Sequence, residues 1–355
     1  MSKLGIKKNT RSNAITYLIV IVAFVLFTIL SNGGVLGRKT VGLLVPACCY
    51  IVMAISLNLT VGILGELSLG HAGFMSVGAF AGVVASTGLS STITSAPLRL
   101  AVAMVIGALF AAIAGFLIGI PVLRLRGDYL AIVTLAFGEI IKEIISCLIV
   151  GTDEKGLHIV FNNNAAKTAD DLGLTPTGTA IIQGAQGATG TQTIASFTAG
   201  FVLIMVALVI VLNFVNSRSG RAVMAIRDNR IAAESVGINI TKYKMIAFTI
   251  SAAIAGAAGA LYGLNYSNIT SAKFDFNTSI LILVFVVLGG LGNIRGSIIS
   301  ATVLYVLPEA LREFADYRML VYAIVLILVM IATNSSKVRT LLTRLLPHKR
   351  EKEVD

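Results

Sequence analysis

Long apolar runs recur along almost the whole sequence, separated by short polar or glycine-rich segments. A helix needs about 20 apolar residues to cross the roughly 30 Å hydrocarbon core of a bilayer. Ten runs approach that length, near residues 14–30, 41–61, 69–87, 98–120, 129–150, 196–216, 246–265, 279–292, 297–311 and 317–334. The pattern therefore predicts an all-α polytopic membrane protein, with about ten transmembrane helices in a single domain over residues 14–334.

Two polar segments between these runs are too long to be simple turns. Residues 151–195 are rich in Asn, Thr and Gly, and residues 217–245 carry several arginines. A segment as long as 151–195 is usually either functional or disordered. The two ends of the chain, residues 1–13 and 335–355, are basic and are expected to lie outside the membrane.

The distribution of Lys and Arg orients the predicted helices. With the amino terminus placed in the cytoplasm, the cytoplasmic segments hold nineteen Lys and Arg and the outer segments hold eight. This bias is the one that the positive-inside rule describes, so we expect an even number of spans and both termini in the cytoplasm. Segment 151–195 then lies outside, and segment 217–245 lies inside between the sixth and seventh spans.

The composition agrees with a membrane protein. Hydrophobic residues make up 56% of the chain and charged residues 13%, whereas soluble domains carry about 25% charged residues. The net charge of +11 is explained by the topology and by attraction to anionic lipid, and it requires no nucleic acid. Residues 1–30 resemble a signal peptide, but no A-x-A site follows, so we expect an uncleaved first span. Cys48, Cys49 and Cys147 all fall in apolar runs, which predicts buried free thiols.

The sequence motifs of common hydrolytic enzymes are missing. There is no G-x-x-x-x-G-K-[ST] phosphate loop and no H-E-x-x-H, and the three histidines (His71, His158 and His348) are scattered. We therefore expect a protein that is not itself an enzyme and that binds no metal and no cofactor of its own.

Segment 217–237, "SRSGRAVMAIRDNRIAAESVG", is polar and basic. Its helix-forming residues predict two short helices over 222–227 and 230–236, with Asp228-Asn229 as stop and cap and Gly237 as the final stop. Small residues that allow close approach favour docking to another protein, and the alternative is a basic amphipathic segment resting on lipid. The candidate docking residues are Gly220, Arg221, Ala225, Arg227, Asp228, Asn229, Arg230, Ala232, Ala233, Glu234 and Gly237.

Four stretches together resemble one family of transport proteins. They are "SRSGRAVMAIRDNRIAAESVGIN" (217–239), "LNLTVGILGELSLGHAGFMSVGA" (57–79), "LRGDYLAIVTLAFGEIIK" (125–142) and "GGLGNIRGS" (289–297). The I-A-A-x-x-x-G at residues 231–237 is similar to the E-A-A-x-x-x-G of ABC importer membrane subunits, the loop that touches the ATPase, with Ile in place of Glu. The chain as a whole resembles the membrane permease subunits of branched-chain amino acid ABC transporters, of the LivM type.

This resemblance implies a fold, a function and partners. It implies about ten helices per subunit, a central coupling loop, and transport of leucine, isoleucine or valine across the bacterial cytoplasmic (inner) membrane. It also implies two ABC ATPase subunits that bind the ATP, a second related permease and an external substrate-binding protein. Urea and other amino-acid permeases share much of the pattern. An ion-coupled carrier or channel is a further alternative, for which an unpaired acid within the membrane would be expected.

Polar residues inside the predicted spans are candidates for the translocation path, because ionisable groups are costly there. Glu139 and Lys142 are spaced i, i+3 and can form a self-neutralised pair facing the bundle interior. Near Glu66 and His71, glycines permit either tight helix packing around a buried, hydrogen-bonded histidine or a broken helix lining a cavity. The path candidates are Glu66, Ser68, His71, Thr134, Glu139 and Lys142.

Overall fold

The computed structural model describes residues 2–33, 37–125, 127–153, 156–161 and 178–311, together with residues 317, 320, 323, 324 and 327. The chain divides into two compact units, Met1–Ala301 and Thr302–Asp355. All the sites discussed below belong to the first unit. The expected tenth span (317–334) and the basic tail (335–355) lie largely or wholly outside the described residues.

Among the described residues, five helices are long and apolar enough to cross a membrane. They are α1 (Ser2–Asn32), α2 (Arg38–Asn58) with the π-helical turn η1 (Leu59–Ile63), α4 (Ala96–Val122), α6 (Phe197–Asn216) and α9 (Ile240–Gly263). Each coincides with one of the ten apolar runs of the sequence, so these five expected spans are confirmed as helices of sufficient length and apolarity.

Four further apolar runs also form helices, but they are shorter or carry more charge. They are α3 (His71–Gly88), α5 (Asp128–Ser146), α10 (Phe276–Gly289) and α11 (Ile294–Ala310). The expectation that the fifth run continues as helix to residue 150 is wrong, because α5 ends at Ser146 and Cys147 is its C-cap. That these helices complete a set of ten spans remains a prediction.

The described residues are mostly helical, as expected, but segment 151–195 contributes to a small antiparallel sheet, so the protein is not purely α-helical. Its strands are β1 (Leu148–Asp153), β2 (Gly156–Phe161) and β3 (Thr179–Gln183), in the order β2-β1-β3. Val150 of β1 lies opposite Ile159 of β2 and Ile182 of β3. Leu, Ile and Val at the start of β1 suit a pleated surface. A short apolar run is compatible with either a helix or a strand, so apolarity alone could not predict that the helix ends before β1.

Small residues bring α3, α4 and α9 into close contact. A Cβ at Gly259 of α9 would overlap the carbonyl oxygen of Met75 in α3. A Cβ at Gly107 of α4 would lie 2.8 Å from the carbonyl oxygen of Gly78 in α3. Such close backbone approach is how membrane helices associate when lipid removes most of the hydrophobic driving force. These three helices therefore form the packed centre of the first unit.

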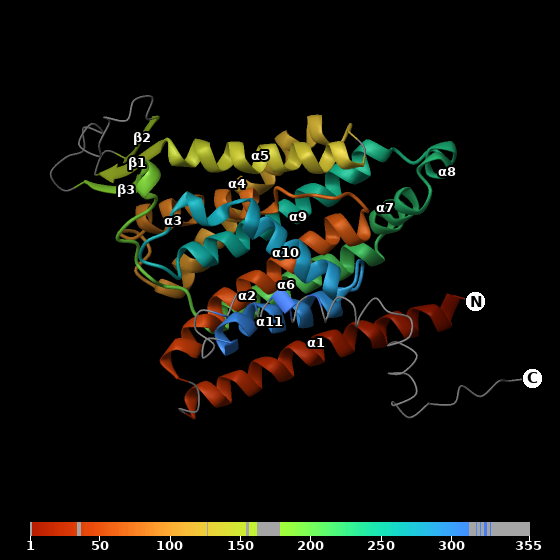
Figure 1. Cartoon of the computed structure of the whole chain (residues 1–355), viewed down its shortest axis with the longest axis horizontal. Helices are drawn as coiled ribbons and strands as arrows, with labels where there is room; N and C mark the ends of the chain where they lie inside the picture. The colour runs from red at the N-terminus through yellow and green to blue at the C-terminus, as the bar shows by residue number, and fades with distance from the viewer. Residues whose placement is uncertain are drawn as a thin grey trace, which may run out of the picture. The chain divides into compact units, whose positions relative to one another are not determined.

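Two further helices of the loop between α6 and α9, α7 (Arg218–Asp228) and α8 (Arg230–Ser235), lie at one end of the first unit. Figure 1 shows the three-stranded sheet at the opposite end, and it shows the amino-terminal end of α1 at the same end as α7 and α8. Helix α1 packs against α6 through stacking of Phe24 on Phe197 and Phe201, with ring centroids 5.1 and 4.0 Å apart.

The three cysteines differ in their surroundings. Cys48 and Cys49 are buried in α2, as the sequence predicts, but Cys147 is exposed. The prediction for Cys147 is wrong because this residue falls at the point where α5 ends and β1 begins.

Candidate functional site

Helices α7 and α8 are held by side-chain caps at each turn of the loop. Ser217 Oγ accepts a hydrogen bond from the Gly220 N–H (3.1 Å) at the start of α7. Asn229 Oδ1 accepts from the Ala232 N–H (3.0 Å) at the start of α8, and Gly237 (φ 83°) follows its end. Two short helices, an Asn cap between them and a glycine stop are confirmed, although α7 begins at Arg218 rather than near residue 222.

The loop also has a small core of its own. Ile226, Ala233 and Ile240 are buried together, with Ile238 and Tyr243 packed against them. Ala233 is one of the small residues that the sequence assigned to close contact with a partner. Its burial shows instead that its small side chain serves the packing of α8 inside the loop.

Two large apolar side chains are exposed at α8 and at its end. Ile231 of α8 is 81% exposed, and Val236, the C-cap residue that follows α8, is 74% exposed. Ala232, Glu234 and Gly237 are also exposed, and a Cβ at Gly237 would meet nothing within 4 Å. The loop therefore presents two large apolar side chains and small neighbours on a framework held by side-chain caps.

Arg227 is directed inward, toward the membrane helices. Its Nη1 donates a hydrogen bond to the carbonyl oxygen of Gly62 (2.9 Å), and its Nε and Nη2 donate to Asp228 Oδ1 (3.1 and 3.0 Å). The Arg227 side chain is still 39% exposed. Arg218 and Arg221 are exposed as well, and Arg221 Nη1 donates to the carbonyl oxygen of Asn216 (2.9 Å). The arginines of this loop therefore do not all serve its outer surface.

The helix formed by α2 and η1 ends at Ile63, and the chain is non-helical from residue 64 to residue 70 before α3 begins. We call residues 64–70 the break segment. Its Glu66 forms an ion pair with Lys244 of α9. The Leu69 N–H donates to Thr134 Oγ1 (3.1 Å), and the buried Ser68 Oγ has no hydrogen-bond partner among the described residues. The helix is therefore broken at this point, yet the break is tightly packed, since a Cβ at Gly70 would overlap the carbonyl oxygen of Thr134.

The break segment leads directly to a buried group of hydroxyls around His71. His71 Nε2 lies 3.0 Å from Ser56 Oγ of α2, and Ser56 Oγ donates to the carbonyl oxygen of Ser251 in α9 (2.6 Å). Thr60 Oγ1 donates to Ser251 Oγ (2.8 Å). The expectation of a buried, hydrogen-bonded histidine is confirmed. A gap beside it, lined in part by Gly70 and Thr134, has no room for a water molecule, so this region is closed.

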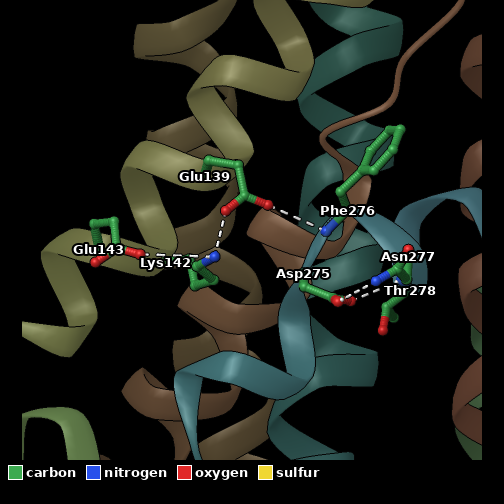
Figure 2. A network of polar contacts seen from close by, with 7 residues as sticks. All are labelled: Glu139, Lys142, Glu143, Asp275, Phe276, Asn277 and Thr278. Carbon is green, nitrogen blue, oxygen red and sulfur yellow. Dashed lines mark hydrogen bonds and ion pairs between the residues drawn. The ribbon is translucent and has the colours of Figure 1, made fainter.

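Glu139 and Lys142 of α5 form the ion pair that their spacing predicts (Figure 2). Lys142 Nζ also lies 3.6 Å from Glu143 Oε1, and Glu139 Oε1 accepts a hydrogen bond from the Phe276 N–H (3.1 Å). The Lys142 and Glu139 side chains are 21% and 35% exposed. The pair thus lies at the edge between α5 and the start of α10, and the expectation that it faces the bundle interior is wrong.

Asp275, at the start of α10, belongs to the same neighbourhood (Figure 2). It accepts hydrogen bonds from the Thr278 N–H (2.9 Å) and from Asn277 Nδ2 (2.8 Å). Burial alone would raise the pKa of Asp275, but these hydrogen bonds and the nearby Lys142 cation hold the pKa of this carboxyl below its usual value. Asp275 is therefore an ionised helix cap.

A cavity of about 400 Å³ lies at the sheet end of the unit and was not foreseen from the sequence. Its walls include hydroxyl groups of Ser86 and Ser90, residues of β3, and Gln192. The buried Arg99 of α4 donates a hydrogen bond from Nη2 to Gln192 Oε1 (2.6 Å). The partners come from separate parts of the chain, so no local motif signals the cavity.

The sequence was then compared with known proteins. Residues 39–330 match the family model described as branched-chain amino acid transport system / permease component. The chain is 34% identical to the high-affinity branched-chain amino acid transport system permease protein LivM of Escherichia coli (strain K12) over 301 residues, which are 83% of this chain and 69% of that protein. It is 34% identical to the corresponding LivH protein of Salmonella typhimurium over 132 residues, 36% of this chain and 42% of that one.

More distantly, the chain is 25% identical over 275 residues to the fructose import permease protein FruG of Bifidobacterium longum, covering 74% of this chain and 72% of that protein. No solved structure was found to match the chain. The apolar helices and these relatives indicate a multi-pass membrane protein whose homologues are transport subunits and not enzymes. The chain belongs to the family of permease components of branched-chain amino acid transport systems.

Proposed function

We propose that this chain is a permease subunit of an ATP-driven importer in the bacterial cytoplasmic membrane, and that it carries leucine, isoleucine or valine. The ATP is bound and hydrolysed on two separate ABC ATPase subunits, and this chain needs no cofactor of its own. The observation that carries the proposal is the exposed apolar side of α8, held on a capped framework at the end of the unit opposite the sheet.

The exposed residues of α8 suit a groove on a partner protein. An amphipathic helix docks by placing its apolar side chains into such a groove, and Ile231 and Val236 are the side chains available for it. Ala232 and Gly237, small and exposed, allow the partner to approach the backbone. Ala233 contributes indirectly, by seating α8 on the loop's own core.

The remaining partners and the topology follow from the two ends of the unit. With α7 and α8 facing cytoplasmic ATPases, the sheet and its polar cavity face outward, where an external substrate-binding protein delivers substrate. The similarity to both LivM and LivH proteins supports pairing with a second, related permease. The amino-terminal end of α1 lies at the loop's end of the unit, which supports placing the amino terminus on the same, cytoplasmic side as α7 and α8.

The polar residues of the proposed path suit a zwitterion with an apolar side chain. Glu66 and Glu139 are both neutralised by lysines, so the candidates that remain for hydrogen bonding to substrate are Ser68, His71 and Thr134. The same pairing disfavours an ion-coupled carrier, for which an unpaired acid would be expected. Urea or another amino acid remains the alternative substrate within the family.

The test of the proposal is a substitution on the exposed side of α8. Ile231→Asp places a charge on that surface without touching the loop's core, so the subunit should accumulate in the membrane but bring down less ATPase on purification. Leu157→Asp is the matched control, because Leu157 is an exposed apolar residue of β2 at the opposite end. Uptake of labelled leucine should fall in parallel with ATPase recruitment only for Ile231→Asp.

Two results would contradict this function. Full ATPase recruitment and uptake by Ile231→Asp would show that α8 rests on lipid and does not dock. If excess urea abolishes leucine uptake while isoleucine and valine do not compete, the transported substrate is urea and not a branched-chain amino acid. The topology is tested separately with single cysteines at Leu157 and Ile231 in a background without the natural cysteines, where an impermeant reagent should label only the first in intact cells.

A further inference from the structure

Two cations from the loop and its flank reach the same point of the membrane helices. Arg227 of α7 donates from Nη1 to the carbonyl oxygen of Gly62 (2.9 Å), and Lys244 of α9 pairs with Glu66. Gly62 lies in the last turn of the α2–η1 helix, and Glu66 lies in the break segment that follows it. Contacts from two different elements therefore converge on the place where this helix ends.

The end of the helix explains why a cation is suited to this position. The last carbonyls of a helix lack N–H partners within the helix and form the negative end of its dipole. In the π-helical turn, the Leu64 N–H donates to the carbonyl oxygen of Leu59 (3.0 Å). The carbonyl oxygen of Gly62, which lies nearer the end of the helix, accepts its hydrogen bond from Arg227. Single π-helical turns of this kind are frequent at functional sites.

The fit of Arg227 against the break segment depends on glycine. Gly65 has φ 81°, and a Cβ there would lie 2.6 Å from Cγ of Arg227. The stem of the arginine therefore runs directly along the backbone of the break segment. Beside the same contact, the Gly292 N–H donates to Asn58 Oδ1 (2.8 Å), so the end of the helix is also fixed by the turn that precedes α11.

Arg227 and Lys244 contact the helix end and the break segment, which carries residues of the proposed substrate path. The break segment contains Glu66 and Ser68, its Leu69 N–H is bound by Thr134, and it delivers His71 to Ser56. A shift of the segment would move these groups together, because they lie on one short stretch of non-helical backbone.

We propose that Arg227 and Lys244 form a latch that transmits movement of α7 and α8 to the break segment, and so to the substrate path. Arg227 is a positioning residue in this scheme, since it acts through the Gly62 carbonyl and the Gly65 backbone. The inference rests on the proposed function, in which an ATPase moves the loop. It adds that recruitment of the ATPase and transmission of its movement are performed by different residues: the outer side of α8 and the inward side of α7.

The competing interpretation is that Arg227 is only a cap that stabilises the helix end. A cap would affect the yield and stability of the subunit, but it would leave the amount of leucine moved per ATP hydrolysed unchanged in the molecules that fold. The ratio of uptake to hydrolysis therefore separates a latch from a cap, and ATPase co-purification separates a latch from a docking residue.

The experiment uses the full complex purified with its partner subunits and reconstituted in lipid vesicles, with labelled leucine supplied through the external binding protein. Arg227→Gln should retain ATPase within about twofold of the parent and should continue to hydrolyse ATP. Leucine moved per ATP should fall by about fivefold or more, the lower end of ordinary coupling between sites. Arg227→Lys keeps a cation but loses the planar fork, so its ratio should lie between those of Arg227→Gln and the parent.

Arg218→Gln is the matched control, because Arg218 is exposed on the same helix and makes no hydrogen bond or ion pair within the described part of the chain. It should leave the ratio unchanged. A parental ratio in Arg227→Gln would overturn the latch, and so would loss of ATPase from this variant, which would place Arg227 in the docking surface. If Arg227→Gln does not accumulate, a parental ratio in Arg227→Lys overturns the latch in the same way.

A different result would contradict the proposed function. If the parent complex itself retains no ATPase, or if Ile231→Asp recruits it fully, then docking through α8 is wrong whatever Arg227 does. A lower uptake ratio in Arg227→Gln alongside normal recruitment is the one combination that supports the latch.

Discussion

Among the ion pairs of the described residues, the one between Glu66 and Lys244 is the most buried. The Lys244 side chain is 4% exposed and the Glu66 side chain 15% exposed. Glu66→Gln removes the negative charge and leaves the lysine in surroundings of low polarity. The change is nearly equal in volume, so the loss of charge is isolated from any change in packing.

The burial sets the expected size of the effect. Removing one partner of a buried pair typically costs about 3–5 kcal/mol, because the other charge stays buried and unpaired. At roughly 2 °C or more for each kcal/mol, the midpoint of thermal unfolding should fall by about 6 °C or more. The double variant Glu66→Leu/Lys244→Met removes both charges, and its stability should return close to that of the parent, since apolar replacement of such pairs is often neutral or better.

The cysteines of the chain provide the assay. Cys48 and Cys49 are buried in α2 and become accessible when the helices separate, whereas Cys147 is exposed from the start. In a Cys147→Ser background, the fluorescence of a thiol-reactive dye therefore reports unfolding of the subunit in detergent. The measurement compares the midpoints of the parent, the single variant and the double variant.

Two outcomes would refute the reasoning. If Glu66→Gln unfolds at the same temperature as the parent, water must reach Lys244 in the folded protein, and the pair is not shielded as its burial indicates. If the double variant is as unstable as the single one, the cost lies in lost packing around the break segment and not in an unpaired charge.

Three further predictions follow from the same structure. Gly259→Ala should sharply reduce the yield of folded subunit, because its Cβ would overlap the backbone of α3 and overpacking costs about 1–3 kcal/mol or more; Gly88→Ala, with nothing within 4 Å, should be harmless in the same expression trial. Asn229→Ala removes the cap of α8 and should cost about 1 kcal/mol, measured as faster proteolysis between α7 and α9. Glu139→Gln should lower the thermal midpoint less than Glu66→Gln, because its pair is more exposed, and Lys142→Met should restore the loss; an equal drop would contradict this ranking.

The local features of the functional loop could be predicted from the sequence because they depend on near neighbours. Asn229 caps α8 through a residue three positions away, and Gly237 ends it through its own backbone freedom. The Glu139–Lys142 pair likewise needs only one turn of helix. Its position at the edge of the bundle depends on where α10 begins, and the sequence around α5 does not contain that information.

The errors share one cause, which is that strands and buried contacts need partners from elsewhere. The apolar run after α5 continues as β1 because β2 and β3 are available to pair with it, and the same break leaves Cys147 exposed. Ala233 was expected to contact a partner, but Ile226 and Ile240 cover it within the loop.

The sequence by itself determined the class of protein, the family, the apolar helices and the capped helices of the loop, because apolar periodicity, caps and family motifs are properties of consecutive residues. Only the tertiary structure decided that Lys244 meets Glu66 and that Arg227 reaches Gly62, contacts that join residues 178 and 165 positions apart. Charge and burial make such contacts favourable once the helices are packed, but many other pairings are equally compatible with the sequence. The packing of α2, α7 and α9 selects among them, because it fixes which cation can reach the end of the broken helix.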